Sequence, residues 1–473
     1  MATVTDRIGR FLDEEAPAWG VERVPASDRR FSGIDLAVLW GDLSIGLLVI
    51  WTGAFLVPGL SFRAALAAII AGTLLGCLPL ALVGLAGTRE GIPTMALFRP
   101  VLGVRGSFLP SAINVVQLVG WTAFEFWAMG NVANAVSRRA GVDAYPLWLA
   151  VVAVVCTLLA IGGPIVVVRR WLERFGIYVM LAAGAWITYR LLAAADLGAI
   201  WRAPGRGGSF WLGVDLVIAM PVSWLPLVAD YNRFARSEAE AFRGTYVGYA
   251  IGNVWFFALG ALVVLAAGAA PEVIGIGEAI LALAGGVVVL AALLAGETDQ
   301  AFANIYSAAV SVQNIAPRLP QRALVGAVGL LGFVLAAVLG NSAESYELFL
   351  LLIGSVFVPL FGVFAADYFV LRGRRRRGGR ASEDEHPGVR WIALVPWIAG
   401  FAVFHWSAPS PLPGWQRAME ALFSGWLGAP FPLLGSALGA SLPSFAVAFV
   451  LAVALLPVGV RRSRSRRAGE RQR

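Results

Sequence analysis

A tryptophan and a carboxylate stand one helical turn apart in an apolar stretch, at Trp121 and Glu125. Asn114 and Gln117 precede them at spacings of three and four residues, so all four side chains would share one helical face. An indole offers a flat surface for stacking, and a carboxylate accepts charge-assisted hydrogen bonds from adjacent N–H donors. This pattern favours binding of a flat heterocycle. The structural alternative makes Trp121 a packing residue and Glu125 the partner of a buried Arg.

A second polar group lies in the stretch from Gly296 to Tyr306. The Thr298 hydroxyl and the Asp299 carboxylate are oxygen ligands of the kind that a hard cation such as Na⁺ prefers. Asp299 could equally carry a proton. In a regular helix Asp299 and Asn304 point about 140° apart. They would therefore share a site only if the helix is distorted near Gly296, and otherwise they would serve adjacent ion and substrate sites.

Two apolar stretches are interrupted by helix breakers, glycines at 41 and 46 and prolines at 221 and 226. Each Pro removes a backbone donor and clashes with the preceding turn. Interrupted backbone is tolerated inside a membrane only where it lines a cavity. Paired interruptions in corresponding positions of two halves indicate a transporter site at the membrane midplane. Each interruption holds two candidate site residues: Asp42 and Ser44 in the first, Ser223 and Trp224 in the second.

The composition defines the elements that must position these residues. Hydrophobic residues make up 59% of the 473 residues and charged residues 14%, against about 45–50% and about 25% in soluble domains. This excludes an ordinary soluble enzyme, and the 11% aromatic content excludes a disordered chain. With about 20 apolar residues needed per span, the apolar runs predict an all-α polytopic membrane protein. Its twelve helices are expected near 34–57, 62–86, 107–137, 146–168, 172–195, 210–229, 244–270, 284–312, 323–340, 347–371, 390–406 and 441–460.

Arginine sets the expected orientation. All 37 basic residues are Arg, and thirty of them fall in the gaps on one side, which predicts that both termini are cytoplasmic in the cell membrane. The basic clusters at 372–380 and 461–473 are expected to face anionic lipid headgroups. They lack the aromatic platform of a nucleic-acid site. The two Cys and two His are too scattered for a disulfide, a metal cluster or an intramembrane enzyme site.

The expected organisation follows from these spans. Spans 1–5 occupy 34–195 and spans 6–10 occupy 210–371, each a possible five-helix repeat, and spans 11–12 occupy 390–460. The cytoplasmic parts are the N-terminal segment 1–33, the basic loop 372–389 and the tail 461–473. The short apolar segment 92–103 is expected at the interface, and 408–440 is expected to hold at most a partial helix. Asp230, after span 6, is expected to pair with Arg233 or Arg236.

Several motifs resemble those of the nucleobase–cation symporters, most closely the branch containing cytosine permease and the hydroxymethylpyrimidine transporters. Residues 107–121 resemble that family's third span, and 219–234 its sixth span with the following loop. Residues 306–314 and 366–372 resemble the ends of its eighth and tenth spans. The resemblance covers about residues 31–375, and the motif in span 6 is the most specific.

The resemblance implies a leucine-transporter-like fold of two inverted five-helix repeats plus two helices. It implies a heterocycle stacked between Trp121 and Trp224, with Glu125 and Asn304 at its edge. The family's sodium ligands are carbonyls of spans 1 and 8 and two span 8 hydroxyls. Those hydroxyl positions match Thr298 and Asp299, so one has become an acid, which is compatible with Na⁺ or with a proton as coupling ion.

The sequence therefore predicts a secondary transporter that imports a nucleobase-like heterocycle by cation symport. A carboxylate at Glu125 favours aminopyrimidines such as cytosine or hydroxymethylpyrimidine over uracil. The substrate-binding candidates are Trp121, Glu125, Gln117, Ser223, Trp224 and Asn304, and the cation-coupling candidates are Asp42, Ser44, Thr298 and Asp299. No cofactor is expected beyond Na⁺ as one of two candidate coupling ions, and no pattern indicates an oligomeric state.

Three alternatives stay open. An amino-acid transporter on the same fold would place a substrate carboxylate on the helix N-termini of spans 1 and 6, where Glu125 would repel it. An intramembrane enzyme and a non-transporting sensor are the others.

Overall fold

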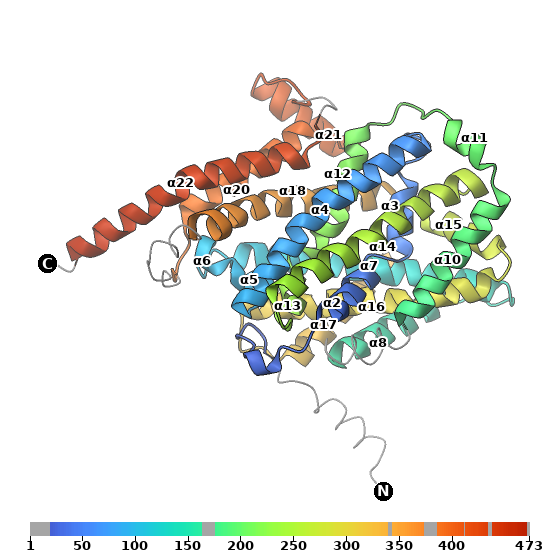
Figure 1. Ribbon diagram of the computed structural model, residues 1–473, viewed down its shortest axis with the longest axis horizontal. Coiled ribbons are helices and arrows are strands. Elements are labelled where there is room, and N and C mark those ends of the chain that lie inside the picture. Colours follow the sequence, from blue (N-terminus) through green and yellow to red (C-terminus); the bar gives the residue numbers. More distant parts are fainter. Residues whose placement is uncertain are drawn as a thin grey trace, which may run out of the picture.

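The computed structural model describes residues 19–162, 176–338, 343–372, 386–410, 412–433 and 438–470. This part of the chain is helical throughout, with one isolated β-bridge between Phe31 and Ala235. The helices form one elongated bundle with the C-terminal helix projecting from one end (Figure 1). The predicted all-α class is confirmed.

Every predicted span contains a helix. Spans 1–5 correspond to α2 (Gly33–Asp42) with α3 (Leu47–Ala54), α4 (Phe62–Glu90), α7 (Phe108–Arg138), α8 (Tyr145–Gly162) and α10 (Ile177–Ala194). Spans 6–10 correspond to α12 (Phe210–Trp224) with α13 (Val228–Asn232), α14 (Glu238–Ala267), α16 (Gly286–Ile315), α17 (Gln321–Val338) and α18 (Ala343–Ala365) with the π-helix η3 (Ala366–Leu371). Spans 11 and 12 are α20 (Trp391–Ser407) and α22 (Ser441–Glu470). In the described residues, six helices are each long and apolar enough to cross a bilayer alone, and α2 with α3 forms a further, bent span.

The first interruption lies where span 1 was expected to break. Helix α2 begins with a capping box in which the Ser32 hydroxyl accepts from Asp35 N–H and the Asp35 carboxylate accepts from Ser32 N–H. The helix ends at Asp42, and α3 starts after Gly46 at an angle of 58° to α2. The four residues between them leave main-chain groups that need partners from elsewhere.

The second interruption lies later than the proline pair suggests. Helix α12 continues through Pro221 to Trp224, and the break falls at 225–227, around Pro226. Neighbouring helices and local adjustments satisfy the backbone groups that a proline frees within a membrane helix. Ser223 and Trp224 therefore lie in the last turn of α12.

Glycines spaced by four residues bring α14 against span 1. A methyl group on Gly248 would collide with the Ala37 carbonyl oxygen, and one on Gly260 with the Ile50 carbonyl oxygen. Small residues let two membrane helices approach to backbone contact. The broken span 1 is thus held along its length by one straight helix.

The regions outside the predicted spans hold short helices. The segment 92–103 forms α5 (Thr94–Leu97) and α6 (Arg99–Leu102), whose apolar side chains are buried in the bundle. The segment 408–440 contains α21 (Pro413–Glu420) and the π-helix η4 (Ala421–Trp426). Two helices were not predicted: α11 (Leu197–Arg202) and α15 (Val273–Ala282).

Some predictions fall outside the described residues: most of the N-terminal segment, the join of spans 4 and 5 at 163–175, most of the basic loop and the end of the tail. The division into two repeats stays a prediction.

Candidate functional site

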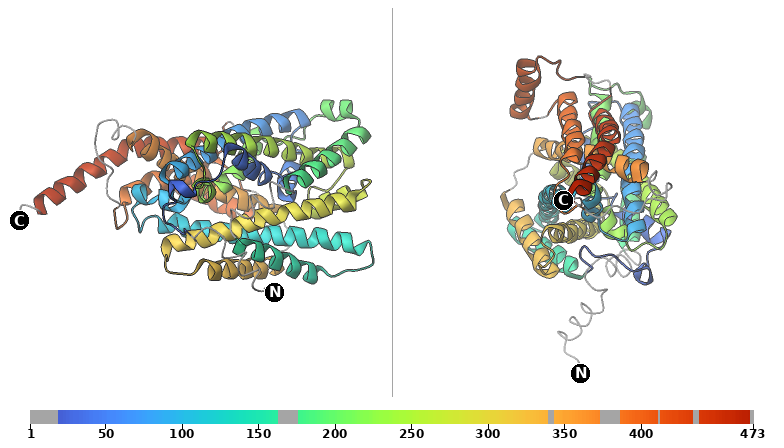
Figure 2. Two further views of the ribbon diagram at one scale, coloured as in Figure 1. Left: turned by 60° about the horizontal axis from the view of Figure 1, so that its bottom comes forward. Right: turned by 90° about the vertical axis from the view of Figure 1, so that its left-hand side faces the viewer.

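The polar face of α7 is buried and meets α12 and α16. The Asn114 amide donates to the Ser311 hydroxyl at 2.8 Å, and the Gln117 amide donates to the Ser223 carbonyl at 2.9 Å. About two turns further along α7, the Asn304 amide donates to Glu125 Oε1 at 2.9 Å. Helices α7 and α16 run side by side through the bundle (Figure 2). The structure thus joins four of the six predicted substrate residues in two pairs, Gln117 with Ser223 and Glu125 with Asn304.

Three polar atoms on this face have no hydrogen-bond partner among the described residues. They are Trp121 Nε1, Gln117 Oε1 and Glu125 Oε2, one donor and two acceptors. All three side chains are at least 95% buried. Buried polar groups in proteins are normally paired with protein or water. Unpaired groups on one face of one helix are therefore candidates to bind a polar ligand.

The two predicted stacking residues are each fixed by other aromatic rings. Trp121 contacts Tyr346 and Phe349 of α18 edge to face, with ring centroids 5.8 and 5.3 Å apart. Trp224 contacts Trp40 of α2 edge to face at 6.3 Å. Such contacts lock the orientation of each indole. A substrate sandwich between the two indoles stays a prediction.

Span 8 holds the break of span 1 through two side chains that were not among the predicted site residues. The Glu297 carboxylate accepts a hydrogen bond from Leu47 N–H, and the Gln300 amide donates to the Ile45 carbonyl at 2.9 Å. Gly46 lies between these two bonds, and a methyl group there would collide with the Gln300 amide nitrogen. The sequence could have indicated these two residues through their spacing from Asn304, because residues 297, 300 and 304 lie on one helical face.

The predicted cation-coupling residues belong to this break and to the segment of α16 beside it, and the hydrogen bonds of Ser44 and Thr298 stay within their own segments. Asp42 is buried, and its carboxyl interacts electrostatically with Glu297. The Ser44 hydroxyl donates to the Gly41 carbonyl at 2.7 Å, within the break. The Thr298 hydroxyl donates to the Ala295 carbonyl of its own helix at 2.6 Å.

Helix α16 is continuous from Gly286 to Ile315, so the distortion considered near Gly296 does not occur. Asp299 is buried, and its electrostatic partners include Cys156 of α8. Asn304 instead meets Glu125 of α7. The role of Asp299 in coupling stays a prediction.

The carboxyls of Glu125 and Glu297 also interact electrostatically. Glu297 of span 8 thus interacts with one acidic side chain of span 1, Asp42, and with one of span 3, Glu125, and these three residues form an acidic centre. The Arg partner considered for Glu125 is replaced by Asn304. A centre of this kind favours a cation, a proton or N–H donors of a substrate.

The end of the bundle that holds residues 19–32 is closed by this segment before α2. Arg233, after α13, is fully buried and donates to the carbonyls of Gly20 and Asp230 at 2.6 and 3.2 Å and to the Tyr306 hydroxyl at 3.5 Å. The predicted partners Asp230 and Arg233 interact electrostatically, and the direct hydrogen bonds of the two side chains go to other groups. The Asp230 carboxylate accepts from Thr94 N–H at 3.0 Å, and Arg233 contacts the main chain of Asp230 instead.

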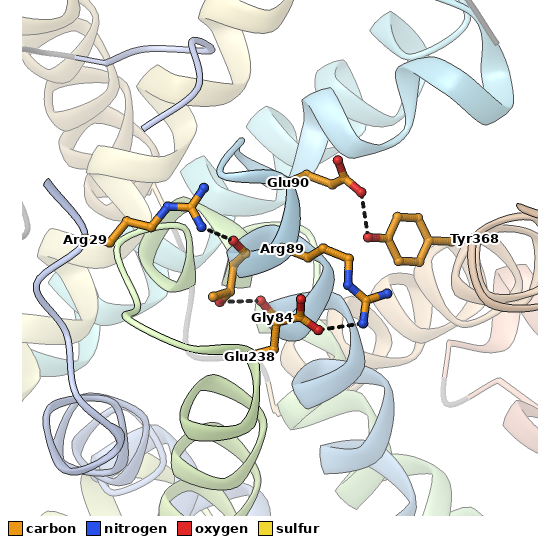
Figure 3. A network of polar contacts seen from close by, with 7 residues as sticks. Arg29, Gly84, Arg89, Glu90, Glu238 and Tyr368 are labelled. Atoms are coloured by element: carbon orange, nitrogen blue, oxygen red, sulfur yellow. Dashed lines mark hydrogen bonds and ion pairs between the residues drawn. The ribbon is translucent and has the colours of Figure 1, made fainter. Parts of the chain in front are cut away.

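A polar network around the end of α4 extends this closure (Figure 3). Arg29 donates to the Thr88 carbonyl at 2.8 Å, which ties the N-terminal segment to α4. Arg89 of α4 pairs with Glu238 of α14 at 2.5 Å. The neighbouring Glu90 accepts from the Tyr368 hydroxyl of η3 at 2.8 Å (Figure 3). The N-terminal segment, α4, α14 and η3 are thereby joined on one side of the site.

Two broken helices, a buried polar face between them and one closed end of the bundle define a multi-pass membrane transporter. The model of the family described as permeases for cytosine/purines, uracil, thiamine and allantoin matches residues 23–428. The chain belongs to this permease family.

Individual relatives agree with this assignment. The chain is 28% identical to the cytosine permease of Escherichia coli (strain K12) over 381 residues, 77% of this chain and 82% of the relative. It is 24% identical to the hydantoin permease of Microbacterium maritypicum over 414 residues, 80% of this chain and 82% of the relative. Its fold is similar to a nucleobase-cation-symport-1 family transporter solved in a closed conformation with bromovinylhydantoin bound. That likeness has a TM-score of 0.76 at 19% identity and covers 94% of this chain and 96% of the other.

Proposed function

We propose that this permease imports an aminopyrimidine-like nucleobase together with a cation. The observation that carries the proposal is the set of unpaired buried atoms on α7. Among the described residues, Trp121 Nε1, Gln117 Oε1 and Glu125 Oε2 have no hydrogen-bond partner. A flat ring that carries two N–H donors and a ring acceptor, as cytosine does, complements one donor and two acceptors. The relatives whose names include cytosine and hydantoin support a planar heterocycle.

Glu125 would select the substrate through the edge of its ring. Its Oε1 is already held by the Asn304 amide, which fixes the carboxyl orientation. Its Oε2 is left to accept from a substrate N–H, and hydrogen bonds to charged groups contribute about 1.5–3 kcal/mol. Cytosine offers an exocyclic amine beside a ring nitrogen. Uracil offers a carbonyl at the corresponding position and would leave the carboxylate facing an acceptor.

The coupling cation would act where span 1 breaks. Asp42 and Ser44 belong to the break, and Thr298 and Asp299 belong to the span 8 segment that faces it. Glu297 and Gln300 bind the main chain on both sides of Gly46, so span 8 and the break are already mechanically linked. A cation or a proton bound among the three acidic groups of this centre would reduce the repulsion between them and would favour the same closed arrangement. We propose Na⁺ or a proton as the coupling ion.

Transport would run into the cytoplasm, with the site in the cell membrane and both termini cytoplasmic. The Arg distribution supports this orientation. Opening toward the cytoplasm requires release of the contacts that Arg233 makes with the N-terminal segment.

Binding of radiolabelled cytosine to the purified protein tests the substrate site. Trp121→Ala and Trp224→Ala are each expected to weaken binding at least tenfold, because each removes one face of the stack. Trp391→Ala is the matched control, since Trp391 is 72% exposed at the start of α20. Unchanged binding in both site variants would overturn the stacking proposal.

The amino-acid alternative makes the opposite prediction for Glu125→Gln. Removing the negative charge would improve binding of a substrate carboxylate, whereas it should weaken binding of cytosine. Competition by an amino-acid mixture, measured with both proteins, separates the two functions.

A further inference from the structure

The indole of Trp40 contacts both segments of the broken span 6. Trp40 belongs to α2, shortly before that helix ends at Asp42. Its ring meets Trp224, the last residue of α12, edge to face with centroids 6.3 Å apart. It also meets Tyr231 of α13 edge to face, with centroids 6.2 Å apart. One side chain of span 1 therefore touches span 6 on either side of its break.

The orientation of Trp40 is fixed by Asn232, the last residue of α13. The Trp40 indole N–H donates to Asn232 Oδ1 at 2.8 Å, and both side chains are fully buried. The Asn232 amide donates in turn to the Thr245 hydroxyl of α14 at 2.8 Å. With a donor against its oxygen and an acceptor against its nitrogen, the amide has one defined orientation.

Asn232 is also held against α4. The Thr88 hydroxyl donates to the Asn232 carbonyl at 2.7 Å. Gly84 lies so close that a methyl group there would collide with the Asn232 amide nitrogen. Helices α4 and α14, which both contact this residue, pack along each other (Figure 1). Because a buried polar group that loses its partner costs free energy, Trp40 and Asn232 stabilise each other in this position.

We propose that Trp40 and Asn232 are positioning residues for Trp224, and that they join the position of α13 to the shape of the substrate site. The inference rests on the proposed function, in which Trp224 supplies one face of the stack. Neither residue needs to contact the substrate. Asn232 holds Trp40, and the edge contact with Trp40 orients the ring of Trp224. A movement of α13 away from α4 would therefore release Trp40 and loosen Trp224.

Fluorine NMR of the protein labelled with 5-fluorotryptophan tests this chain of contacts without any substrate. The resonance of Trp224, one of 17 tryptophans, is assigned by its loss in Trp224→Phe. Thr245→Val removes the hydroxyl that holds Asn232, and Thr245→Ser keeps it. Thr73→Val is the matched control, because the Thr73 hydroxyl of α4 accepts from the Asn253 amide of α14 at 2.7 Å, in the same helix interface.

The Trp224 resonance is expected to move by more than its native linewidth in Thr245→Val and to keep its native position in Thr245→Ser and Thr73→Val. Trp40→Phe keeps an aromatic ring and lacks the indole N–H, so adding Thr245→Val to it should cause no further change. A native resonance in Thr245→Val would overturn the proposal. A shift of equal size in Thr73→Val, or on adding Thr245→Val to Trp40→Phe, would also overturn it, because the effect would then not pass through Trp40.

Cytosine affinity measures the consequence of this positioning for the substrate site. Trp40→Phe is expected to bind cytosine at least about fivefold more weakly, because it leaves the buried Asn232 oxygen unpaired. Thr73→Val should keep the native affinity. Native affinity in Trp40→Phe would overturn the positioning role. Absence of cytosine binding by the native protein would refute the proposed function alone, because the fluorine comparison needs no ligand.

Discussion

Glu297 is expected to hold the break of span 1 through a hydrogen bond that does not depend on its charge. Its carboxylate accepts from Leu47 N–H, at the first residue of α3. Glu297→Ala removes this acceptor and leaves a buried N–H unpaired. Leaving a buried donor unpaired costs about 1–3 kcal/mol, which corresponds to about a 5- to 150-fold lower population of the ordered break. Because the substrate site lies beside the break, cytosine affinity should fall by a similar factor.

Glu297→Gln separates the hydrogen bond from the charge. The amide oxygen of Gln can still accept from Leu47 N–H, so cytosine affinity should stay within about threefold of the native value. This change is smaller than the loss of affinity expected for Glu297→Ala, in which the hydrogen bond is absent. Hydrogen exchange of the peptide covering residues 41–47 should become faster in Glu297→Ala and stay unchanged in Glu297→Gln. Glu278→Ala serves as the control, because Glu278 is 62% exposed on α15. Native affinity and native exchange in Glu297→Ala would refute the role assigned to Glu297.

Three further predictions follow from the same geometry. Glu125→Gln should weaken cytosine binding by about 10- to 100-fold, because it replaces a charged group with two acceptor oxygens by a neutral amide with one acceptor oxygen and one donor nitrogen. Equilibrium binding measures this change, and an unchanged affinity would show that Glu125 does not contact the substrate. Gly46→Ala should abolish binding while the protein still folds, because the added methyl displaces the Gln300 amide and the Glu297 carboxylate from the break. Native cytosine binding in this variant would contradict the close approach of these two side chains to Gly46. Arg233→Lys should loosen the N-terminal segment, because one ammonium group cannot reproduce the guanidinium contacts with Gly20, Asp230 and Tyr306; faster proteolysis near residue 20 is the expected result, and an unchanged rate would argue against the closure.

The spans could be predicted because length and apolar content are sufficient to identify a membrane helix. The two breaks could be located because Gly and Pro act on the backbone itself. The end of α12 could not be placed between Pro221 and Pro226, since neighbouring helices accommodate Pro221. The glycine spacing that joins α14 to span 1 was readable in the sequence, and its meaning depended on knowing which helix lies opposite.

The buried polar face of span 3 could be predicted because its polar residues stand on an otherwise apolar helix, and its role as a substrate site stays a prediction. On span 8, the orientation of the polar side chains was harder to predict. Four consecutive polar residues, from Glu297 to Gln300, point in four directions that together cover most of a helical turn. Only tertiary packing decides which of them face the break, and in the structure these are Glu297 and Gln300. The resemblance to relatives directed attention to Thr298 and Asp299, whose coupling role the geometry leaves as a prediction.

Accumulation of radiolabelled cytosine in proteoliposomes, with Na⁺ and proton gradients imposed separately, tests the central proposal most directly. The proposal predicts uptake above the equilibrium level when one inwardly directed gradient is present, and loss of that uptake in Trp121→Ala. Equal uptake in the presence and absence of both gradients would contradict cation symport.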